Sequence, residues 1–234
     1  MNKEDLLKTV DTRIQINPTI GSKDSIQNQD NSKMTSLKSG TTTVGVTCKD
    51  AVVLGTDKRA TMAYFIASKT AKKLHEIQEH CWITIAGSVA DAQYLVDLLQ
   101  AETSLYQLEK EKPVPIKAAG RILSNILYRN KLFPYQVGLI LGGVTEKEGS
   151  VLLDIGAYGS ILPEKYIAVG SGQNFSYGVL EAKYKDDLSV EEAKNIVKSA
   201  VTSSIIRDMA SGNGIDIVVV RKEGPAEREF VPIK

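Results

Sequence analysis

The clearest pattern in the chain begins at Thr41, where side chains start to alternate between two faces. Residues 41–48 follow the period of two that is typical of a strand. A second apolar run, residues 51–57, comes after only Lys49 and Asp50, and so short a connection predicts an antiparallel hairpin.

The hairpin brings an acidic residue close to the start of its first strand. If Cys48 pairs with Ala51, the chain folds back so that Asp57 lies nominally opposite Thr42. The pattern therefore predicts a carboxylate within a residue of Thr41, and leaves open the face of the sheet on which it lies.

Similar patterns predict the elements that follow. Strands are expected over residues 72–77, 81–86, 135–143, 150–155, 165–169 and 215–221, with a weaker one near Phe230. Helices are expected over residues 88–109, 116–132 and 175–184, and over a segment that opens at the capping box Ser189 to Glu192. Strands grouped between pairs of helices differ from a βαβ winding. The order predicts an α+β fold, a four-layer α/β/β/α sandwich with two antiparallel sheets.

Residues 1–40 differ in composition from the rest of the chain. They contain no aromatic residue, are rich in polar residues and lack a helical or strand period. Such a segment buries too little apolar surface to offset its ordering entropy. We expect a disordered leader over 1–40 and one folded domain over 41–234.

Composition limits the classes of protein that the chain fits. A length of 234 residues with 42% apolar residues suits one sizeable domain, and the net charge of +1 argues against nucleic acid or an anionic membrane as a main partner. There is no hydrophobic signal segment and no apolar run of about 20 residues, so a cytoplasmic location is expected. Cys48 and Cys81 are too few for a disulfide framework or a zinc site and are expected to be reduced, buried thiols.

Three motifs that would indicate other chemistry are incomplete or absent. His75 and His80 are five residues apart, whereas two histidines on one helical face need a spacing of four, so no metal site is expected. Gly170-Ser171-Gly172 lacks the third glycine of a dinucleotide fingerprint, and no Gly-x-Ser-x-Gly elbow occurs.

Six motifs in sequence order carry a resemblance to a known family. They are Gly40-Thr41-Thr42-Thr43-Val44-Gly45-Val46, Gly55-Thr56-Asp57-Lys58-Arg59-Ala60-Thr61, Lys72-Lys73-Leu74, Thr84-Ile85-Ala86-Gly87-Ser88, Gly170-Ser171-Gly172 and Arg207-Asp208-Met209-Ala210-Ser211-Gly212. With them the chain resembles a proteasome β subunit of archaeal type, an N-terminal-nucleophile hydrolase. The resemblance covers nearly everything from Thr41 onward and implies the same four-layer fold, with Gly40 at the end of a propeptide.

The resemblance also implies a role for individual residues. Thr41 would be the nucleophile, supported by Lys73 and Asp57, and Gly87 would offer its N–H to the oxyanion. The residues that would hold the terminal amine and a nearby water are Ser171, Asp208 and Ser211. Thr61 and Gly87 would bind the substrate backbone as an added strand. The specificity pocket would be lined by Ala60, Ala71, His75, Ile85 and Val89.

The chemistry of these roles can be checked from the residues alone. A hydroxyl needs a base beside it, and a free α-amine, with a pKa near 8, is a base carried on the same residue. The amide nitrogen of an uncut Gly40-Thr41 bond cannot take up a proton, so the precursor should be inactive until that bond is cleaved. Gly40 lacks a Cβ, which permits unusual backbone angles and leaves its carbonyl open to attack by the Thr41 hydroxyl. Cleavage of the leader is therefore expected to be intramolecular.

Ile85 at the base of the pocket and the lack of a nearby acid predict cleavage after apolar residues. His75 departs from the aromatic residue that archaeal relatives commonly carry there. Neither a metal nor another cofactor is implied.

Three hypotheses of function fit these observations. The first is an active threonine endopeptidase in the central seven-membered rings of a barrel with outer α-subunit rings, acting on polypeptides and reached by a regulatory ATPase only through the α ring. The second is a structural β subunit that fills a ring position without cutting, or is slowly processed. The third is another N-terminal-nucleophile amidohydrolase that acts on a small amide, which the motifs around Asp57 and Ser211 disfavour.

Overall fold

The computed structural model describes residues 40–222 and 224–233. The expectation of a disordered leader concerns residues that lie, apart from Gly40, outside the described ranges. None of the described helices is long and apolar enough to cross a membrane.

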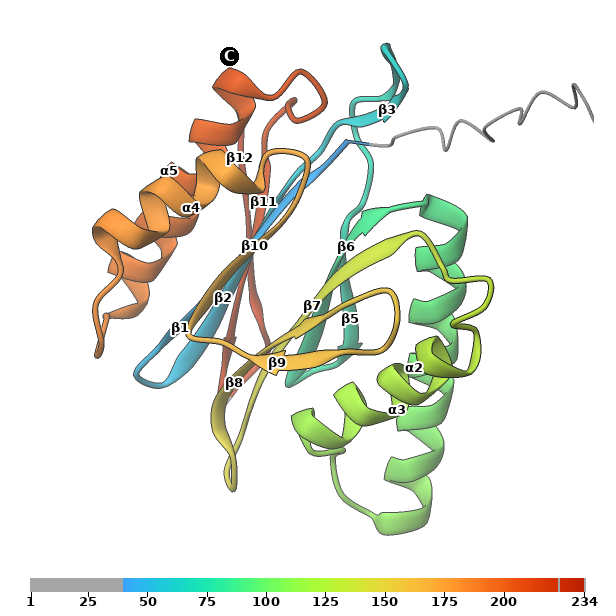
Figure 1. The fold of residues 1–234 in the computed structure, drawn as a ribbon. Helices are drawn as coiled ribbons and strands as arrows, with labels where there is room; N and C mark the ends of the chain where they lie inside the picture. The colour runs from blue at the N-terminus through green and yellow to red at the C-terminus, as the bar shows by residue number, and fades with distance from the viewer. Residues whose placement is uncertain (1–39, 223, 234) are drawn as a thin grey trace, which may run out of the picture. The chain divides into compact units, whose positions relative to one another are not determined.

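Two five-stranded antiparallel sheets form the centre of the fold (Figure 1). The first has the order β10-β1-β2-β11-β12 and consists of β1 (Thr42–Cys48), β2 (Ala51–Asp57), β10 (Tyr166–Gly170), β11 (Ile215–Arg221) and β12 (Glu227–Val231). The second has the order β5-β6-β7-β8-β9 and consists of β5 (Leu74–Gln78), β6 (Cys81–Gly87), β7 (Val137–Thr145), β8 (Gly149–Ile155) and β9 (Ile161–Pro163). A separate two-stranded ribbon pairs β3 (Ala60–Met62) with β4 (Phe65–Ser68).

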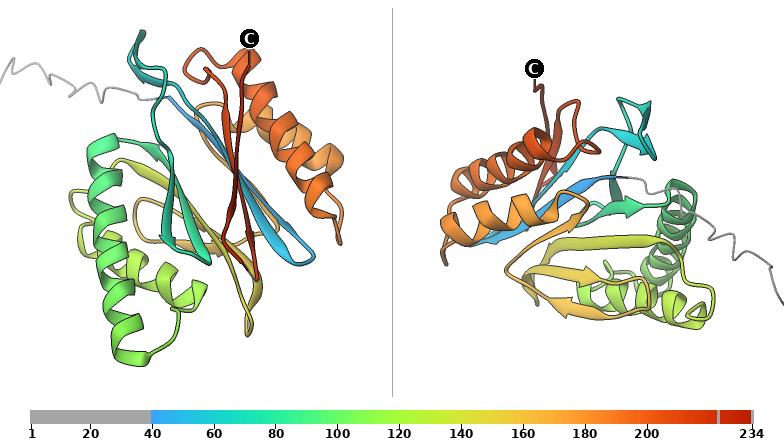
Figure 2. Two further views of the ribbon diagram at one scale, coloured as in Figure 1. Left: turned by 180° about the vertical axis from the view of Figure 1, so that it is seen from behind. Right: turned by 45° about the horizontal axis from the view of Figure 1, so that its top comes forward.

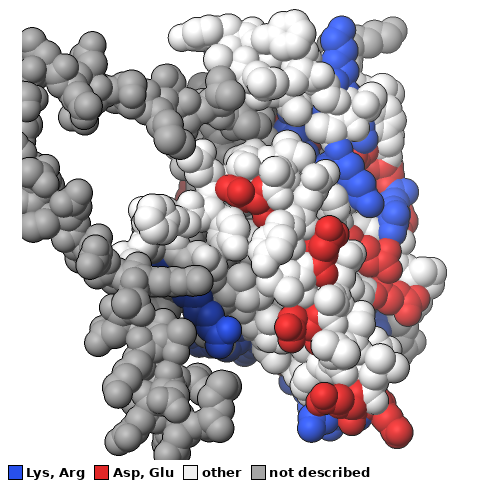
Figure 3. Space-filling view, turned by 90° about the vertical axis from the view of Figure 1, so that its right-hand side faces the viewer, with Lys and Arg blue, Asp and Glu red and all other residues white. Residues whose placement is uncertain are grey.

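A pair of helices covers the outer face of each sheet (Figure 2). Helices α4 (Gln173–Lys183) and α5 (Val190–Arg207) pack on the first sheet, and α2 (Val89–Lys110) and α3 (Ile116–Arg129) pack on the second. Each helix pair shares an apolar cluster with its own sheet, and a third cluster lies between the two sheets. The predicted four-layer α/β/β/α sandwich is confirmed. On the face that carries α2, acidic and basic side chains are both present (Figure 3).

The first hairpin has the predicted register. Cys48 pairs with Ala51 and Thr43 pairs with Thr56, so Asp57 ends β2 beside the start of β1. Cys48 and Cys81 are both buried free thiols, as expected.

The structure differs from the sequence predictions at short elements and element ends. The strands β3, β4 and β9 were not predicted, because each has only three or four residues, most of them exposed or half-buried, and so carries no clear alternation. Helix α3 ends at Arg129 instead of residue 132, since the Asn130 N–H bonds to the Leu127 carbonyl three residues back and closes the last turn.

Candidate active site

Asp57 is the centre of the hydrogen-bond network at the end of β2. Its side chain is fully buried. Oδ1 accepts a hydrogen bond from the Thr42 N–H at 2.9 Å and from Lys73 Nζ at 2.7 Å. Oδ2 accepts from the N–H groups of Arg59 and Gly212, each at 2.9 Å. Four donors compensate the desolvation of this carboxylate and fix its orientation.

Lys73 lies just before β5 and connects the second sheet to the first. It is 5% exposed, pairs with Asp57 and also donates to the Arg59 carbonyl. Burial lowers the pKa of the Lys73 ammonium, and the Asp57 carboxylate acts against that effect. Asp57 Oδ1 thus accepts from both the buried Lys73 ammonium and the Thr42 N–H.

Thr41 is 3% exposed and is held through its backbone and its side chain. The Thr41 hydroxyl donates to the Gly40 carbonyl oxygen at 2.7 Å, and its N–H donates to Ser171 Oγ at 3.1 Å. The Gly40 N–H donates to Thr61 Oγ1 at 3.0 Å. The hydroxyl of Thr41 therefore lies directly beside the peptide bond that joins it to the leader.

A second acidic cluster forms where α5 ends. Asp208 is the C-cap of α5, and its Oδ2 accepts hydrogen bonds from Ser171 Oγ at 2.6 Å and Ser211 Oγ at 2.7 Å. Ser211 Oγ also lies 2.7 Å from Thr42 Oγ1. The structure thus brings Ser171, Asp208 and Ser211 together, and Ser171 joins this cluster to the backbone nitrogen of Thr41.

Two glycines of the site are required by close contacts. A Cβ on Gly40 would lie 1.7 Å from Ala210 Cβ. Close packing therefore accounts for a glycine at this position, and the expected unusual backbone angle stays a prediction. Gly87 has φ of 106°, and a Cβ there would lie 2.1 Å from the Gln136 carbonyl oxygen.

The residues expected to line a specificity pocket are only partly brought together by the contacts. His75 pairs with Ile83 across β5 and β6, so it shares a face of the sheet with Ile85, and this face is covered by α2, which begins at Val89. Among the described residues, no hydrogen bond or strand pair joins Ala60 or Val89 to His75.

Burial and the neighbouring Lys72 lower the pKa of His75, whose Nε2 lies 3.2 Å from the Lys72 carbonyl oxygen. The imidazole is therefore neutral at pH 7. Ala71 is fixed by its N–H, which donates to the Lys58 carbonyl at 3.0 Å.

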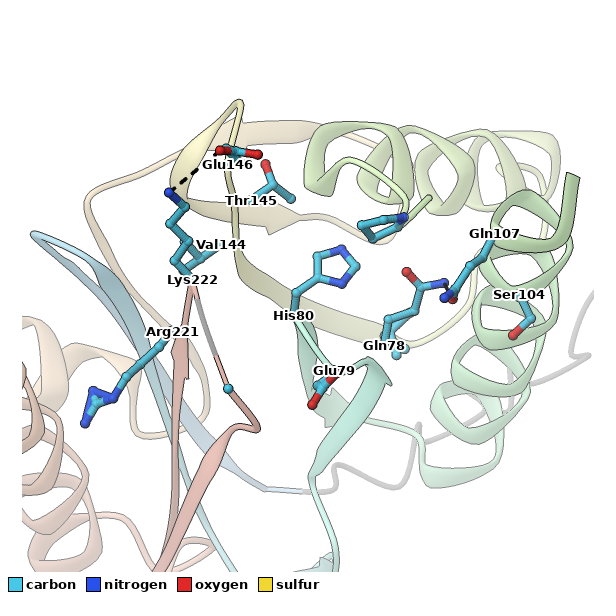
Figure 4. Close-up of a pocket in the computed structure, with 13 residues that line it drawn as sticks. Gln78, Glu79, His80, Ser104, Gln107, Val144, Thr145, Glu146, Arg221 and Lys222 are labelled. Carbon is cyan, nitrogen blue, oxygen red and sulfur yellow. Dashed lines mark hydrogen bonds and ion pairs between the residues drawn. The ribbon is translucent and has the colours of Figure 1, made fainter. Parts of the chain in front are cut away.

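A cavity of about 780 Å³ lies at the ends of the strands that are remote from Asp57 and Gly87 (Figure 4). Two pairs of its lining residues bond to each other: Gln78 Nε2 donates to Gln107 Oε1 at 3.1 Å, and Lys222 pairs with Glu146 at 4.0 Å. The cavity is lined by the turn after β5, whereas Asp57 and Gly87 lie at the other ends of β2 and β6. It takes no part in the cluster around Thr41.

Comparison with known proteins identifies the family. Residues 37–220 match a family model described as "Proteasome subunit". The chain is 44% identical to proteasome subunit beta 2 of Aeropyrum pernix over 196 residues, which are 84% of this chain and 88% of that protein. The chain belongs to the proteasome subunit family.

Other relatives of this proteasome subunit are also β subunits of archaea. The chain is 45% identical to proteasome subunit beta of Ferroglobus placidus over 195 residues, 83% of this chain and 90% of that protein. It is 47% identical to proteasome subunit beta of Methanocaldococcus fervens over 186 residues, 79% of this chain and 83% of that protein. The resemblance drawn from the motifs is confirmed.

Sequence reasoning assigned no role to two residues that hold the site of this proteasome subunit together. Thr42 links Asp57 to Ser211 through its N–H and its hydroxyl. Arg59 donates from Nε to Asn213 Oδ1 at 2.9 Å and from Nη1 to the Met209 carbonyl at 2.8 Å. Both residues lie inside motifs that were recognised, but a motif does not show which contacts its members make.

Proposed function

We propose that this β subunit is a threonine endopeptidase, with Thr41 as nucleophile, that is activated by cleavage of the Gly40–Thr41 bond. The observation that carries the proposal is the position of the buried Thr41 hydroxyl, 2.7 Å from the Gly40 carbonyl oxygen. The polar groups that the chemistry needs surround the same residue.

In the proposed cleavage of the leader, Thr41 Oγ1 adds to the Gly40 carbonyl carbon. The C–N bond breaks, the nitrogen of Thr41 takes up a proton, and Gly40 is left as an ester on the side chain. Water hydrolyses this ester, which releases residues 1–40 and frees the amine. The proposed positioning of the amine is supported by Ser171, which accepts from the Thr41 N–H, and by its partner Asp208, which Ser211 also contacts.

The free amine supplies the base for peptide hydrolysis. It accepts the proton of Thr41 Oγ1 as the oxygen attacks a substrate carbonyl, and passes the proton to the leaving amine as the acyl-enzyme forms. Water then hydrolyses the acyl-enzyme. The Lys73 ammonium favours the neutral amine and the developing negative charge, and the Gly87 N–H would stabilise the oxyanion.

Cleavage after apolar residues is the proposed specificity. Ile85 is buried on the face that His75 shares, and the neutral imidazole adds no charge to that face. Ala60, Ala71 and Val89 complete the proposed pocket, and Thr61 with Gly87 would hold the substrate backbone as an extra strand.

Assembly completes the proposed function. One sandwich of this size does not enclose a chamber, so confinement of polypeptide substrates would come from a seven-membered ring of β subunits between rings of α subunits. A regulatory ATPase would act only through the α ring. The proposed location is the cytoplasm, with neither nucleic acid nor membrane as a partner.

Mass spectrometry of the assembled protein tests the proposal. We expect a chain that begins at Thr41 and hydrolyses peptides, and a Thr41→Ala variant that keeps its leader and is inactive. Thr41→Ser, which retains a hydroxyl, should keep both processes at a reduced rate. Full-length wild-type chains in completed but inactive assemblies would instead identify a structural β subunit.

A further inference from the structure

The turn at Gly87 is packed against a peptide group from another strand. Gly87 ends β6, pairs with Val137 and leaves too little space for a Cβ beside the Gln136 carbonyl oxygen. Two residues before Gly87, the Ile85 N–H donates to the Lys73 carbonyl at 2.9 Å. The position of the Gly87 amide relative to Lys73 therefore depends on where the Gln136 peptide lies.

Gln136 is itself held at both its backbone N–H and its carbonyl by residues at the start of α2. Its carbonyl accepts from the Ser88 N–H at 2.7 Å, and its N–H donates to Asp91 Oδ2 at 2.9 Å. Ser88 is the N-cap of α2, and its Oγ accepts from the Asp91 N–H at 3.4 Å. These bonds form one closed set that joins the start of α2 to the start of β7.

Asp91 is well placed for this task because it lies in the first turn of α2, where the helix dipole favours a carboxylate. The Ser88 N–H is already bonded to the Gln136 carbonyl. The preceding amide, that of Gly87, is therefore the one that would serve the proposed oxyanion site. We propose that Asp91 is a positioning residue, which holds Gln136 against Gly87 and thereby fixes the orientation of the Gly87 N–H. The inference rests on the proposed function of Thr41 and Gly87.

Kinetics on the full chain in its assembled form test this role. Outright removal of an oxyanion donor costs about 10² to 10³ in kcat, and a displaced donor should cost less, about ten-fold for Asp91→Ala. KM should change by less than about two-fold, because the donor acts mainly on the transition state. Affinity for a peptide boronate, whose adduct with the Thr41 hydroxyl is tetrahedral, should fall about as much as kcat.

Two further variants separate positioning from a general loss of structure. Asp91→Asn keeps an oxygen that can accept from Gln136 and should restore kcat to near the wild-type value. Glu102→Ala removes another carboxylate from α2 that lies outside this set of bonds, and should behave as wild type. An Asp91→Ala variant with wild-type kcat and boronate affinity would overturn the inference. A rise in KM as large as the loss of boronate affinity would also overturn it.

Hydrogen exchange gives a readout that needs no activity. Peptides that cover residues 86–89 and 135–137 should exchange faster in Asp91→Ala, but not in Asp91→Asn or Glu102→Ala. Unchanged exchange would overturn the inference even if activity fell. An inactive wild-type protein would contradict the proposed function, and the exchange data would then still decide whether Asp91 holds the turn.

Discussion

Lys73 Nζ lies 2.7 Å from Asp57 Oδ1, and both side chains are almost wholly shielded from solvent. Removal of one partner from such a pair leaves the other charge buried without compensation, which is costly. Loss of either partner is therefore expected to destabilise the fold at the place that is proposed to support Thr41.

Lys73→Ala should lower the free energy of unfolding by about 3 kcal/mol, because Asp57 then keeps only its backbone donors. Peptide hydrolysis should fall by about 10² or more. Urea unfolding and a peptidase assay measure the two effects. Lys73→Met, which fills most of the volume without a charge, should be destabilised almost as much; full recovery in this variant would show that the loss came from a cavity.

Gly40→Ala should slow removal of the leader, since the new Cβ would overlap Ala210 Cβ. The fraction of trimmed chain, measured by mass spectrometry over time, reports the rate. In the double variant Gly40→Ala with Ala210→Gly the contact is relieved, so trimming should recover. A double variant as slow as Gly40→Ala would point to the flexibility of the Gly40 backbone instead.

Glu192 should stabilise the folded protein at neutral pH and lose this effect as the pH becomes acidic. Hydrogen bonds from Lys185 and from Ser189 lower the pKa of Glu192 to about 2. A carboxyl whose pKa is lowered by folding contributes fully above its ordinary pKa, and the contribution is lost as the pH falls toward the lowered value. The stability difference between wild type and Glu192→Ala should thus be constant above about pH 5 and shrink toward about pH 2. A difference that does not vary with pH would contradict the assignment.

Both thiols should be unreactive in the folded protein. Burial raises the pKa of Cys81 to about 12 and also raises that of Cys48. At about pH 8 we expect alkylation by iodoacetamide to be at least a hundred-fold slower than in the urea-unfolded chain, because the thiolate is the reactive form. Mass spectrometry after a timed pulse measures both rates, and rapid labelling of the native protein would disprove the prediction.

The parts of the site that lie within one hairpin could be predicted from the sequence. A two-residue connection and a period of two allow one register, and that register alone is enough to put Asp57 beside the start of β1. The same pattern did not show that Asp57 bonds to the N–H of Gly212, since that contact depends on how the loop after α5 returns to the sheet.

Contacts between distant segments could be identified only through the family resemblance. Asp208 caps α5, and nothing in its local pattern indicates that Ser171 and Ser211 share its Oδ2. The packing of Gly40 against the Ala210 methyl group was not predicted, because Ala210 comes from a segment remote in sequence. Packing between segments is what a single sequence leaves undetermined.

The hydrogen bond from the Gly40 N–H to Thr61 Oγ1 suggests a second reason why the uncleaved chain would be inactive. Under the proposed function, Thr61 also helps to bind the backbone of an incoming polypeptide, so the leader contacts a residue that the substrate needs. In a chain that still carries its leader, the leader would therefore act as a competitive inhibitor. Cleavage of the Gly40–Thr41 bond would both free the Thr41 amine and release Thr61 for the substrate. The inactive precursor and the active enzyme would then differ in what Thr61 contacts, the leader in one and the substrate in the other.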